Sequence, residues 1–255
     1  MKISIVTVAF NSGQTIADTI RSVRLQTYDH VEYIIVDGGS TDNTLDIIRE
    51  NGIDFPNLKW ISEKDHGLYD AINKGIQMAT GDVVGILNSD DFYTSSNILD
   101  VVAREFSITP DIDAVYGDIH FVRTENLNKC VRYYSSKIFQ PHMMRGGFMP
   151  AHPSFFVRRS CYEKYGLYKD NYKICGDFEL LLRFIYVNQI RIKYLPLDMV
   201  TMRMGGVSTR GIKSHIKITQ EHFQALRENN IPINLGMLFF RYLYKLTEFY
   251  KLNRN

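Results

Sequence analysis

Residues 3–42 read ISIVTVAFNSGQTIADTIRSVRLQTYDHVEYIIVDGGSTD. Two apolar runs in this stretch, Ile3 to Phe10 and Tyr33 to Val36, have the composition of buried strands. Between the two runs, apolar residues recur at helical spacing, at Ile16, Ile20 and Val23. Because neighbouring parallel strands need a crossover connection, this order predicts a strand-helix-strand unit of a parallel sheet.

The same alternation continues to about residue 90. Two more strands are predicted at Leu58 to Ile61 and at Val83 to Leu87. The helices between them are predicted from apolar residues at Leu45, Ile47 and Ile48, and at Leu68, Ala71, Ile72 and Ile76. We therefore expect an α/β fold, with a mostly parallel central sheet flanked by helices.

From about residue 113 the pattern is less regular. Short strands are predicted near Ala114 to Tyr116, Cys130 to Tyr134 and Ser154 to Val157. A helix is predicted from Asp177 to Val187, where apolar residues follow helical spacing. We expect these elements to complete the sheet that the first half begins.

The composition of the 255 residues is that of an ordinary globular chain, with 45% hydrophobic and 23% charged residues, which argues against disorder. A net charge of +2 is too small to indicate nucleic-acid binding. Cys130, Cys161 and Cys175 contain no CxxC pair, which favours reduced thiols and a cytoplasmic location.

Neither a signal peptide nor a membrane span is predicted. Met1 and Lys2 lead directly into the first strand, without an apolar stretch and cleavage site. Apolar runs stay below the ~18 residues that cross a bilayer, since Arg241 and Lys245 interrupt the most apolar late segment.

Polar residues follow each of the four predicted strands, at Asn11, at Asp37, at Glu63 and Asp65, and from Asn88 to Asp91. Ligands of such sheets bind beyond the carboxyl ends of the strands. The last group ends in two adjacent carboxylates, Asp90 and Asp91, which suit Mg²⁺ or Mn²⁺ carrying a diphosphate. The competing interpretation for each single carboxylate is a cap or turn residue.

Four motifs together resemble inverting family 2 glycosyltransferases, which have the Rossmann-like GT-A fold. They are Ser4 to Asn11, Val36 to Asp42, Asn88 to Asp91 and Gly176 to Leu180, and the similarity extends over most of residues 1–205. The segment from Asp65 to Gly75 also resembles the family, in a subgroup of enzymes associated with bacterial polysaccharide and O-antigen assembly. The resemblance implies a nucleotide-sugar donor, commonly a UDP-sugar, and Mn²⁺ or Mg²⁺ as cofactor.

The resemblance also implies site residues. Asp37 would bind the nucleobase, Asp90 and Asp91 the ribose and the metal-diphosphate, and Asp177 would be the catalytic base. Asp65, Asn73 and Lys74 would contact sugar, ribose or diphosphate, although a solvated helix face is an equal alternative. The implied nucleotide-sugar site comprises Val8, Phe10, Asn11, Asp37, Gly39, Asp65, Asn73, Lys74, Asn88, Ser89 and Asp90.

Two positions depart from the family pattern. Asn88 stands where the family often has Asp, which leaves Asp90 and Asp91 as the metal-side pair. Gly176 stands where a Glu frequently precedes the base, so an accessory carboxylate would come from elsewhere, for which Glu179 is the candidate. Asp177 at a helix start also has a simpler interpretation, an acidic residue favoured by the helix dipole.

Two loops are weaker candidates. His152 precedes a predicted strand and resembles a His near the acceptor pocket of the subgroup, with a structural role as its alternative. The segment from Arg203 to Arg210, with Ser208, has the glycines and polar groups of a mobile loop that closes over a diphosphate. An exposed turn is the alternative there.

Residues 235–252 form a predicted basic amphipathic helix, which could lie in a membrane interface, on its own domain or on another subunit. We divide the chain into a GT-A domain at 1–210 and a helical extension at 211–255. Within the domain, 1–112 would bind the nucleotide-sugar and 113–210 the acceptor.

The function that these patterns indicate is metal-dependent, inverting sugar transfer to an acceptor hydroxyl, with a lipid-linked saccharide as acceptor and the inner face of the plasma membrane as location. Two alternatives are open. A nucleotidyltransferase would carry a basic, Gly-rich loop after the first strand, which residues 10–15 lack. A binding module without catalysis would not need Asp177.

Overall fold

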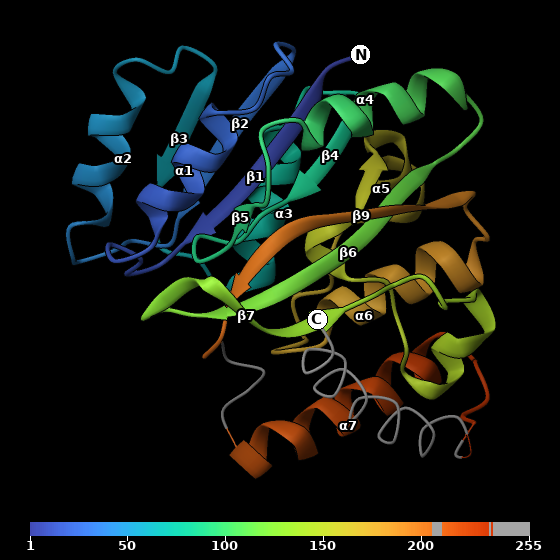
Figure 1. Cartoon of the computed structure of the whole chain (residues 1–255). Helices are drawn as coiled ribbons and strands as arrows, with labels where there is room; N and C mark the ends of the chain where they lie inside the picture. The colour runs from blue at the N-terminus through green and yellow to red at the C-terminus, as the bar shows by residue number, and fades with distance from the viewer. Residues whose placement is uncertain (206–210, 235, 237–255) are drawn as a thin grey trace.

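The computed structural model of the chain describes residues 1–205, 211–234 and 236, and has one sheet between two layers of helices (Figure 1). The strands are β1 (Ile3–Ala9), β2 (Val31–Asp37), β3 (Leu58–Ser62), β4 (Val83–Ile86), β5 (Phe92–Tyr93), β6 (Ala114–Arg123), β7 (Asn126–Tyr134), β8 (Phe156–Arg158) and β9 (Ile192–Arg203). Within the described residues these nine strands pair in the order β3-β2-β1-β4-β8-β6-β9-β5, and β7 pairs with β6.

The α-helices are α1 (Ile16–Arg24), α2 (Thr44–Gly52), α3 (Leu68–Met78), α4 (Ile98–Ile108), α5 (Arg159–Tyr165), α6 (Gly176–Leu181) and α7 (Gly211–Glu228). Two short 3-10 turns, η1 (Pro141–Gly146) and η2 (His152–Ser154), and one π-helical turn, η3 (Leu182–Val187), complete the described elements.

Strand direction brings the candidate loops to one edge. β1 pairs in parallel with β2 and β4, and β2 with β3. β8 is antiparallel to both β4 and β6, so β6 runs in the same direction as β4, and β9 is parallel to β6. The carboxyl ends of β1, β2, β4, β6 and β9 therefore share one edge of the sheet. The expected α/β fold with a mostly parallel sheet is confirmed.

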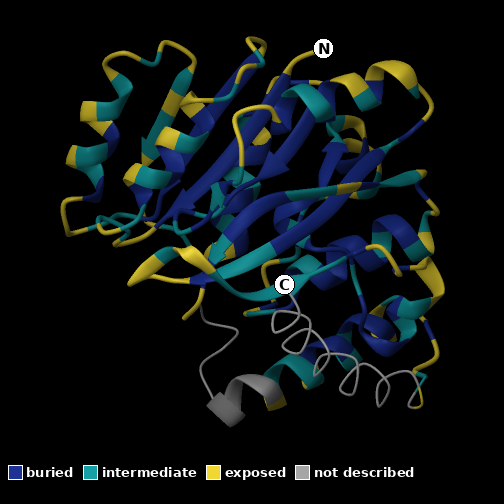
Figure 2. Ribbon diagram, viewed as in Figure 1, coloured by how far each residue is buried: buried dark blue, intermediate teal, exposed yellow. Residues whose placement is uncertain are grey.

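Alternation along the strands builds a core on each face of the sheet. In β1, Ile3 and Ile5 pack with α1, α2 and α4, whereas Val6 and Val8 pack with α3, α5 and α6. Figure 2 shows the central strands β1, β2 and β4 buried and the outer helix faces exposed. Each fully buried aliphatic side chain contributes roughly 1.5–3 kcal/mol relative to exposure. This double-sided burial explains why the first strands are continuously apolar.

The first four predicted strands are confirmed to within two residues at each end. The strand predicted at Ser154 to Val157 begins later, at Phe156, because η2 occupies the preceding residues. Pro153 in that turn has no backbone N–H and a fixed φ, so it cannot join the ladder. The predicted helix from Asp177 to Val187 consists of α6 followed by η3.

The sequence patterns did not predict β9. Pro196 lies in the middle of this strand, and proline argues against a central strand. The ladder between β6 and β9 shifts register there, from Tyr116 opposite Tyr194 to Asp118 opposite Asp198. The irregularity accommodates Pro196 and lets the strand continue to Arg203.

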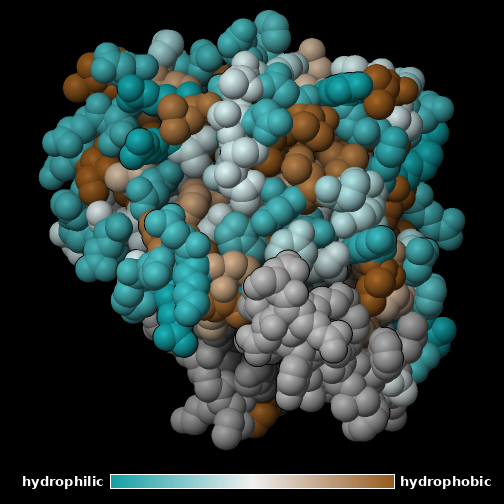
Figure 3. All heavy atoms as spheres, in the orientation of Figure 1, coloured by the Kyte–Doolittle hydropathy of each residue, from teal (hydrophilic) through white to brown (hydrophobic). Residues whose placement is uncertain are grey.

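The surface is mixed in character. On the face drawn in Figure 3, hydrophobic residues lie in separate groups among hydrophilic ones. In the described part of the chain, no helix combines the length and the apolar character that a membrane span requires. The amphipathic helix predicted at 235–252 lies outside the described residues, apart from residue 236.

Candidate active site

The loops that follow β1, β2 and β4 are joined by hydrogen bonds. Ser12 Oγ lies 2.8 Å from Ser89 Oγ. The Asn11 amide N–H donates to Ser40 Oγ at 2.8 Å, and Asn11 Oδ1 accepts from the Thr41 N–H at 2.9 Å. Asn11 has φ +49°, a left-handed conformation that asparagine tolerates better than most residues. These contacts fix the three loops as one platform at the edge of the sheet.

The predicted donor residues on this platform differ in exposure. The side chain of Val8 is buried within β1, whereas Phe10 is 63% exposed just past the strand end. Ser89 is buried, and Asn88 is half-buried, with its Nδ2 3.5 Å from Asp91 Oδ2. Phe10 therefore offers an aromatic surface to a ligand at this edge.

Asp37 shapes the loop after β2. Its carboxylate is fully buried, and Oδ2 accepts from the Gly39 and Ser40 N–H groups at 3.1 and 2.9 Å. The Ser62 hydroxyl donates to the same oxygen at 2.7 Å, and the Ser40 hydroxyl donates to Oδ1. Asp37 thus holds the turn that contains Gly39, and connects it to the end of β3.

Asp65 faces the same turn from the start of α3. Its Oδ2 occupies the space that a side chain at position 38 would need, since a Cβ on Gly38 would lie 2.3 Å away. Its Oδ1 accepts from the Gly67 N–H at 3.0 Å. Lys74, which lies on α3 one helical turn after Asp70, pairs with Asp70 at 3.4 Å and with Glu63 at 2.9 Å.

Asn73 has a different environment from the other predicted donor residues. Its Nδ2 donates to the Tyr168 carbonyl at 2.8 Å, and its Oδ1 accepts from the Tyr168 N–H at 3.0 Å. Both polar ends of the amide are therefore engaged with one backbone unit. This pairing ties α3 to the segment before α6 and gives Asn73 a structural role.

The segment from Arg203 to Arg210 was predicted to be a mobile loop, and the structure contradicts this at Arg203. It is the last residue of β9 and is buried, where a flexible loop residue would be exposed. Its Nη1 donates to the Asp90 carbonyl at 2.6 Å, its Nη2 pairs with Asp18, and its guanidinium lies over the Phe92 ring. Arg203 thus supports the carboxylate loop from behind. Ser208 and Arg210 lie outside the described residues.

The two adjacent carboxylates are not equivalent. Asp90 is half-buried, and burial raises its pKa. Asp91 is fully buried, and burial together with the charge of Asp90 raises its pKa well above the usual value. Thr19 Oγ1 donates to the Asp91 carbonyl at 2.7 Å, which seats this loop on α1. Only Asp90 is accessible from the platform.

The residues present fit a divalent cation of the Mg²⁺ type. Asp91 Oδ1 is a buried oxygen without a hydrogen-bond partner, and two carboxylates lie side by side in a desolvated place, an arrangement that a cation would stabilise. Among the described residues, no three His, Cys, Asp or Glu side chains converge. Such a site would complete its shell with water and phosphate oxygens, as Mg²⁺ usually does.

Asp177 is the second residue of α6, and its side chain is only 15% exposed. Burial raises the pKa of Asp177, and the nearby His152 opposes this rise. His152 Nε2 lies 3.8 Å from Asp177 Oδ2. A carboxylate of raised pKa is a stronger proton acceptor than an exposed one, so the position suits a general base.

Tyr69 explains the glycine that precedes Asp177. A Cβ on Gly176 would lie 2.6 Å from atoms of the Tyr69 ring, so no larger residue fits beside it. The Tyr69 hydroxyl accepts from the Gly176 N–H at 2.9 Å and donates to the Ile174 carbonyl at 2.7 Å. The ring of a residue on α3 thus contacts the backbone directly before Asp177.

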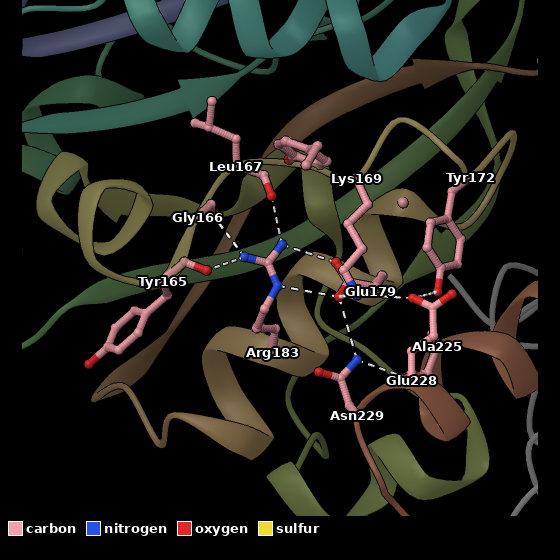
Figure 4. Close-up of polar contacts among 12 residues, drawn as sticks. Tyr165, Gly166, Leu167, Lys169, Tyr172, Glu179, Arg183, Ala225, Glu228 and Asn229 are labelled. Carbon is pink, nitrogen blue, oxygen red and sulfur yellow. Dashed lines mark hydrogen bonds and ion pairs between the residues drawn. The ribbon is translucent and has the colours of Figure 1, made fainter.

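Glu179 does not supply an accessory carboxylate, so that hypothesis is wrong. Glu179 is two residues after Asp177, and residues two apart in a helix point about 200° from each other, so the two side chains face opposite sides of α6. Its carboxylate is 0% exposed and pairs with Lys169 at 2.9 Å and Arg183 at 3.0 Å. Figure 4 shows this network, which also includes Glu228 of α7 and the backbone carbonyls that Arg183 binds, such as that of Leu167.

Two residues of the site were not predicted. Tyr69 lies inside the motif at 65–75, and a buried tyrosine hydroxyl usually has a partner, which is the signal that could have drawn attention to it. Asp18 is a half-exposed residue in the first turn of α1 and carries no local signal. Its contact with Arg203 spans 185 residues of sequence.

Known proteins of similar sequence and fold include glycosyltransferases. A glycosyltransferase of PGL/p-HBAD biosynthesis from Mycobacterium bovis BCG is 28% identical over 210 residues, which cover 80% of this chain and 78% of that protein. S. aureus TarS residues 1–349, crystallised with UDP-GlcNAc, superpose with a TM-score of 0.70 at 17% identity, over 89% of this chain and 66% of that fragment, slightly under two thirds of its length.

A second solved structure shares the fold. PcManGT of Pyrobaculum calidifontis, a mannosyltransferase in complex with GDP-Man and Mn²⁺, superposes with a TM-score of 0.64 at 18% identity, over 89% of this chain and 63% of that one. Residues 4–166, more than half of the chain, match the profile described as glycosyl transferase family 2. The chain therefore belongs to glycosyl transferase family 2 and is a glycosyltransferase with the GT-A fold.

Proposed function

We propose that this glycosyltransferase moves one sugar from a nucleoside-diphosphate donor, a UDP-sugar, to a hydroxyl of a lipid-linked saccharide in bacterial surface polysaccharide synthesis, with inversion at the anomeric carbon and with Mn²⁺ or Mg²⁺ bound. The observation that carries the proposal is the buried Asp177 carboxylate, of raised pKa, which lies next to Tyr69 in the first turn of α3 and 3.8 Å from His152. A module that only binds nucleotide-sugars would have no use for such a base.

On the donor side, the proposal assigns the nucleobase to the turn shaped by Asp37, with the ring of Phe10 beside it. The accessible carboxylate of Asp90 would hold the cation, and the enclosed Asp91 would support it from below. When bound, Mg²⁺ or Mn²⁺ would neutralise the charge that develops on the leaving diphosphate. Asn73 is left out of the proposed donor site because Tyr168 already engages its amide.

On the acceptor side, Asp177 would accept the proton of the acceptor hydroxyl as its oxygen attacks the anomeric carbon. The bond from that carbon to the diphosphate oxygen breaks in the same step, and the nucleoside diphosphate leaves on the opposite face. His152, 3.8 Å from Asp177, would orient the carboxylate and favour its ionised form. A single displacement of this kind inverts the anomeric configuration.

A donor screen tests the proposed reaction. We expect the full-length chain with Mn²⁺ to hydrolyse one of UDP-Glc, UDP-Gal, UDP-GlcNAc or GDP-Man slowly, since water can replace the acceptor. The released sugar, read by NMR before mutarotation, is expected to be the β-anomer from an α-linked donor. An α-anomer would contradict single displacement, and no hydrolysis or binding of any nucleotide-sugar would contradict the function.

The helix predicted at 235–252 carries a further expectation, membrane association at the inner face of the plasma membrane. Its basic residues would favour anionic lipid, since each contributes roughly 1 kcal/mol near such a surface. We expect the full chain to co-sediment with phosphatidylglycerol vesicles and a version ending at Asn230 to remain in the supernatant. Equal behaviour of the two versions would assign this segment to packing.

A further inference from the structure

Three backbone N–H groups directly before α6 point at one carboxylate. The N–H groups of Lys173, Ile174 and Cys175 donate to Glu221 at 3.1, 2.9 and 2.8 Å. Glu221 lies on α7, 46 to 48 residues further along the chain, and is only 1% exposed. A helix from the C-terminal part of the chain therefore holds the segment that leads into the base.

Of these three contacts, the one with the N-cap residue Cys175 takes the place of a local cap. The first N–H groups of a helix have no partners within it, and a side chain at the helix start usually binds one of them. α6 has no such side-chain hydrogen bond at its N-cap, Cys175. Burial opposes ionisation of Glu221, but hydrogen bonds from the three amides hold its pKa below the usual range. Glu221 is therefore a buried, ionised carboxylate in contact with the segment before Asp177.

The opposite side of the same segment is held by α3. The Tyr69 hydroxyl binds the Ile174 carbonyl and the Gly176 N–H, and its ring fills the space beside Gly176. The four residues 173–176 therefore lie between Glu221 and Tyr69. The next residue is Asp177, so these two contacts help to position it, together with Tyr69 and His152, which lie beside its carboxylate.

We propose that Glu221 is a positioning residue for Asp177, through which α7 becomes part of the catalytic apparatus. The inference rests on the proposed function, since the position of Asp177 matters for the rate only if Asp177 acts as the base. Misplacing a reacting group by about 1 Å can cost on the order of 100-fold in rate. Loss of the three hydrogen bonds would loosen the segment and allow such a displacement.

Other contacts keep α7 in place when Glu221 is changed. The rings of Phe178 and His222 lie 4.2 Å apart, and Cys175 Sγ contacts the Ile218 carbonyl at 3.6 Å. Near the far end of α7, Glu228 pairs with Lys169, as Figure 4 shows. We therefore expect Glu221→Gln to fold, with its effect limited to residues 173–177 and to the ion pair that Glu221 forms with Lys217 at 3.4 Å.

The test uses the full chain with Glu221→Gln, assayed with the nucleotide-sugar that the donor screen identifies. We expect kcat to fall on the order of 10-fold to 100-fold, while the donor KM and the calorimetric affinity for UDP with Mn²⁺ stay within two-fold. Deuterium exchange of the peptide containing 173–177 is expected to accelerate, because the Gln amide keeps only one acceptor oxygen where Glu221 uses both. At least one of the three backbone N–H groups then loses its acceptor.

The pH profile separates positioning from general stability. Activity requires ionised Asp177, so kcat is lost as the pH falls through its raised pKa. A loosened segment admits water and relieves part of the desolvation, so the acid limb in Glu221→Gln is expected to move to lower pH. A loss of global stability would not move this limb.

Glu32→Gln is the matched control. Glu32 is also a buried carboxylate, but it binds Lys2 and Lys59 near the opposite edge of the sheet. Its loss is expected to lower the melting temperature without changing kcat or the acid limb. An active wild type with unchanged kcat and acid limb in Glu221→Gln would overturn the inference and leave the proposed function standing.

Two further measurements cover the remaining outcomes. If Glu221→Gln does not fold, Tyr69→Phe is the second variant, since it removes the hydrogen bonds of the Tyr69 hydroxyl to Ile174 and Gly176. An unchanged kcat in Tyr69→Phe would then overturn the inference. If the wild type turns over no donor, the proposed function fails by itself. Deuterium exchange then decides the structural claim, which unchanged exchange at 173–176 would refute.

Discussion

Asp177→Asn is expected to abolish sugar transfer while leaving donor binding intact. The amide keeps the shape of the carboxylate but cannot accept the acceptor proton, and a positioned general base contributes about 10² to 10⁴ in rate. The burial that raises the pKa of Asp177 makes it a stronger base than an exposed aspartate. Transfer rates, together with UDP affinity measured by calorimetry with Mn²⁺, test both halves of this expectation.

Asp46→Asn is the control for the simpler interpretation of Asp177. Asp46 also lies in the first turn of a helix, α2, and is exposed. If Asp177 served only the helix dipole, both substitutions would cost at most about 1 kcal/mol of stability and little activity. A folded Asp177→Asn protein with transfer within a few-fold of wild type would remove the assignment of Asp177 as base.

Asp90→Asn is expected to remove the Mn²⁺ dependence of UDP binding and to reduce transfer on the order of 10³-fold, since a bound cation stabilises developing charge by several kcal/mol. The physical reason is the loss of the one accessible charge in the desolvated pair with Asp91. Calorimetry of UDP binding with and without Mn²⁺ measures the first effect. Excess EDTA is expected to reproduce the second effect in the wild type.

Asp82→Asn provides a matched control at the other end of the same strand. Asp82 is exposed next to the start of β4, where it accepts from the Lys2 N–H, and its loss should leave UDP binding unchanged. Asp91→Asn separates the two members of the carboxylate pair. If Asp91 only supports Asp90, Asp91→Asn is expected to weaken metal-dependent UDP binding less than Asp90→Asn does. Full turnover after verified metal removal would refute the proposed cofactor.

The sequence by itself determined the parts of this protein that depend on local periodicity. The continuous apolar runs of β1, β2 and β4 follow from burial on both faces of a parallel sheet. The direction of those strands then brings Asn11, Asp37 and Asp90 to one edge. The motifs at these positions also identified the family before any tertiary contact was considered.

Only the tertiary structure decided which polar groups are free to act and which support others. The sequence did not predict β9, nor the buried position of Arg203, because Pro196 argues against a central strand. The register shift that accommodates this proline is visible only in the pairing of β9 with β6. Asn73 and Glu179 appear available in the sequence, but Tyr168 and Arg183 engage them. Glu221 reaches its three amides across more than 45 residues. Such contacts depend on how elements distant in the sequence pack together, which local sequence patterns do not predict.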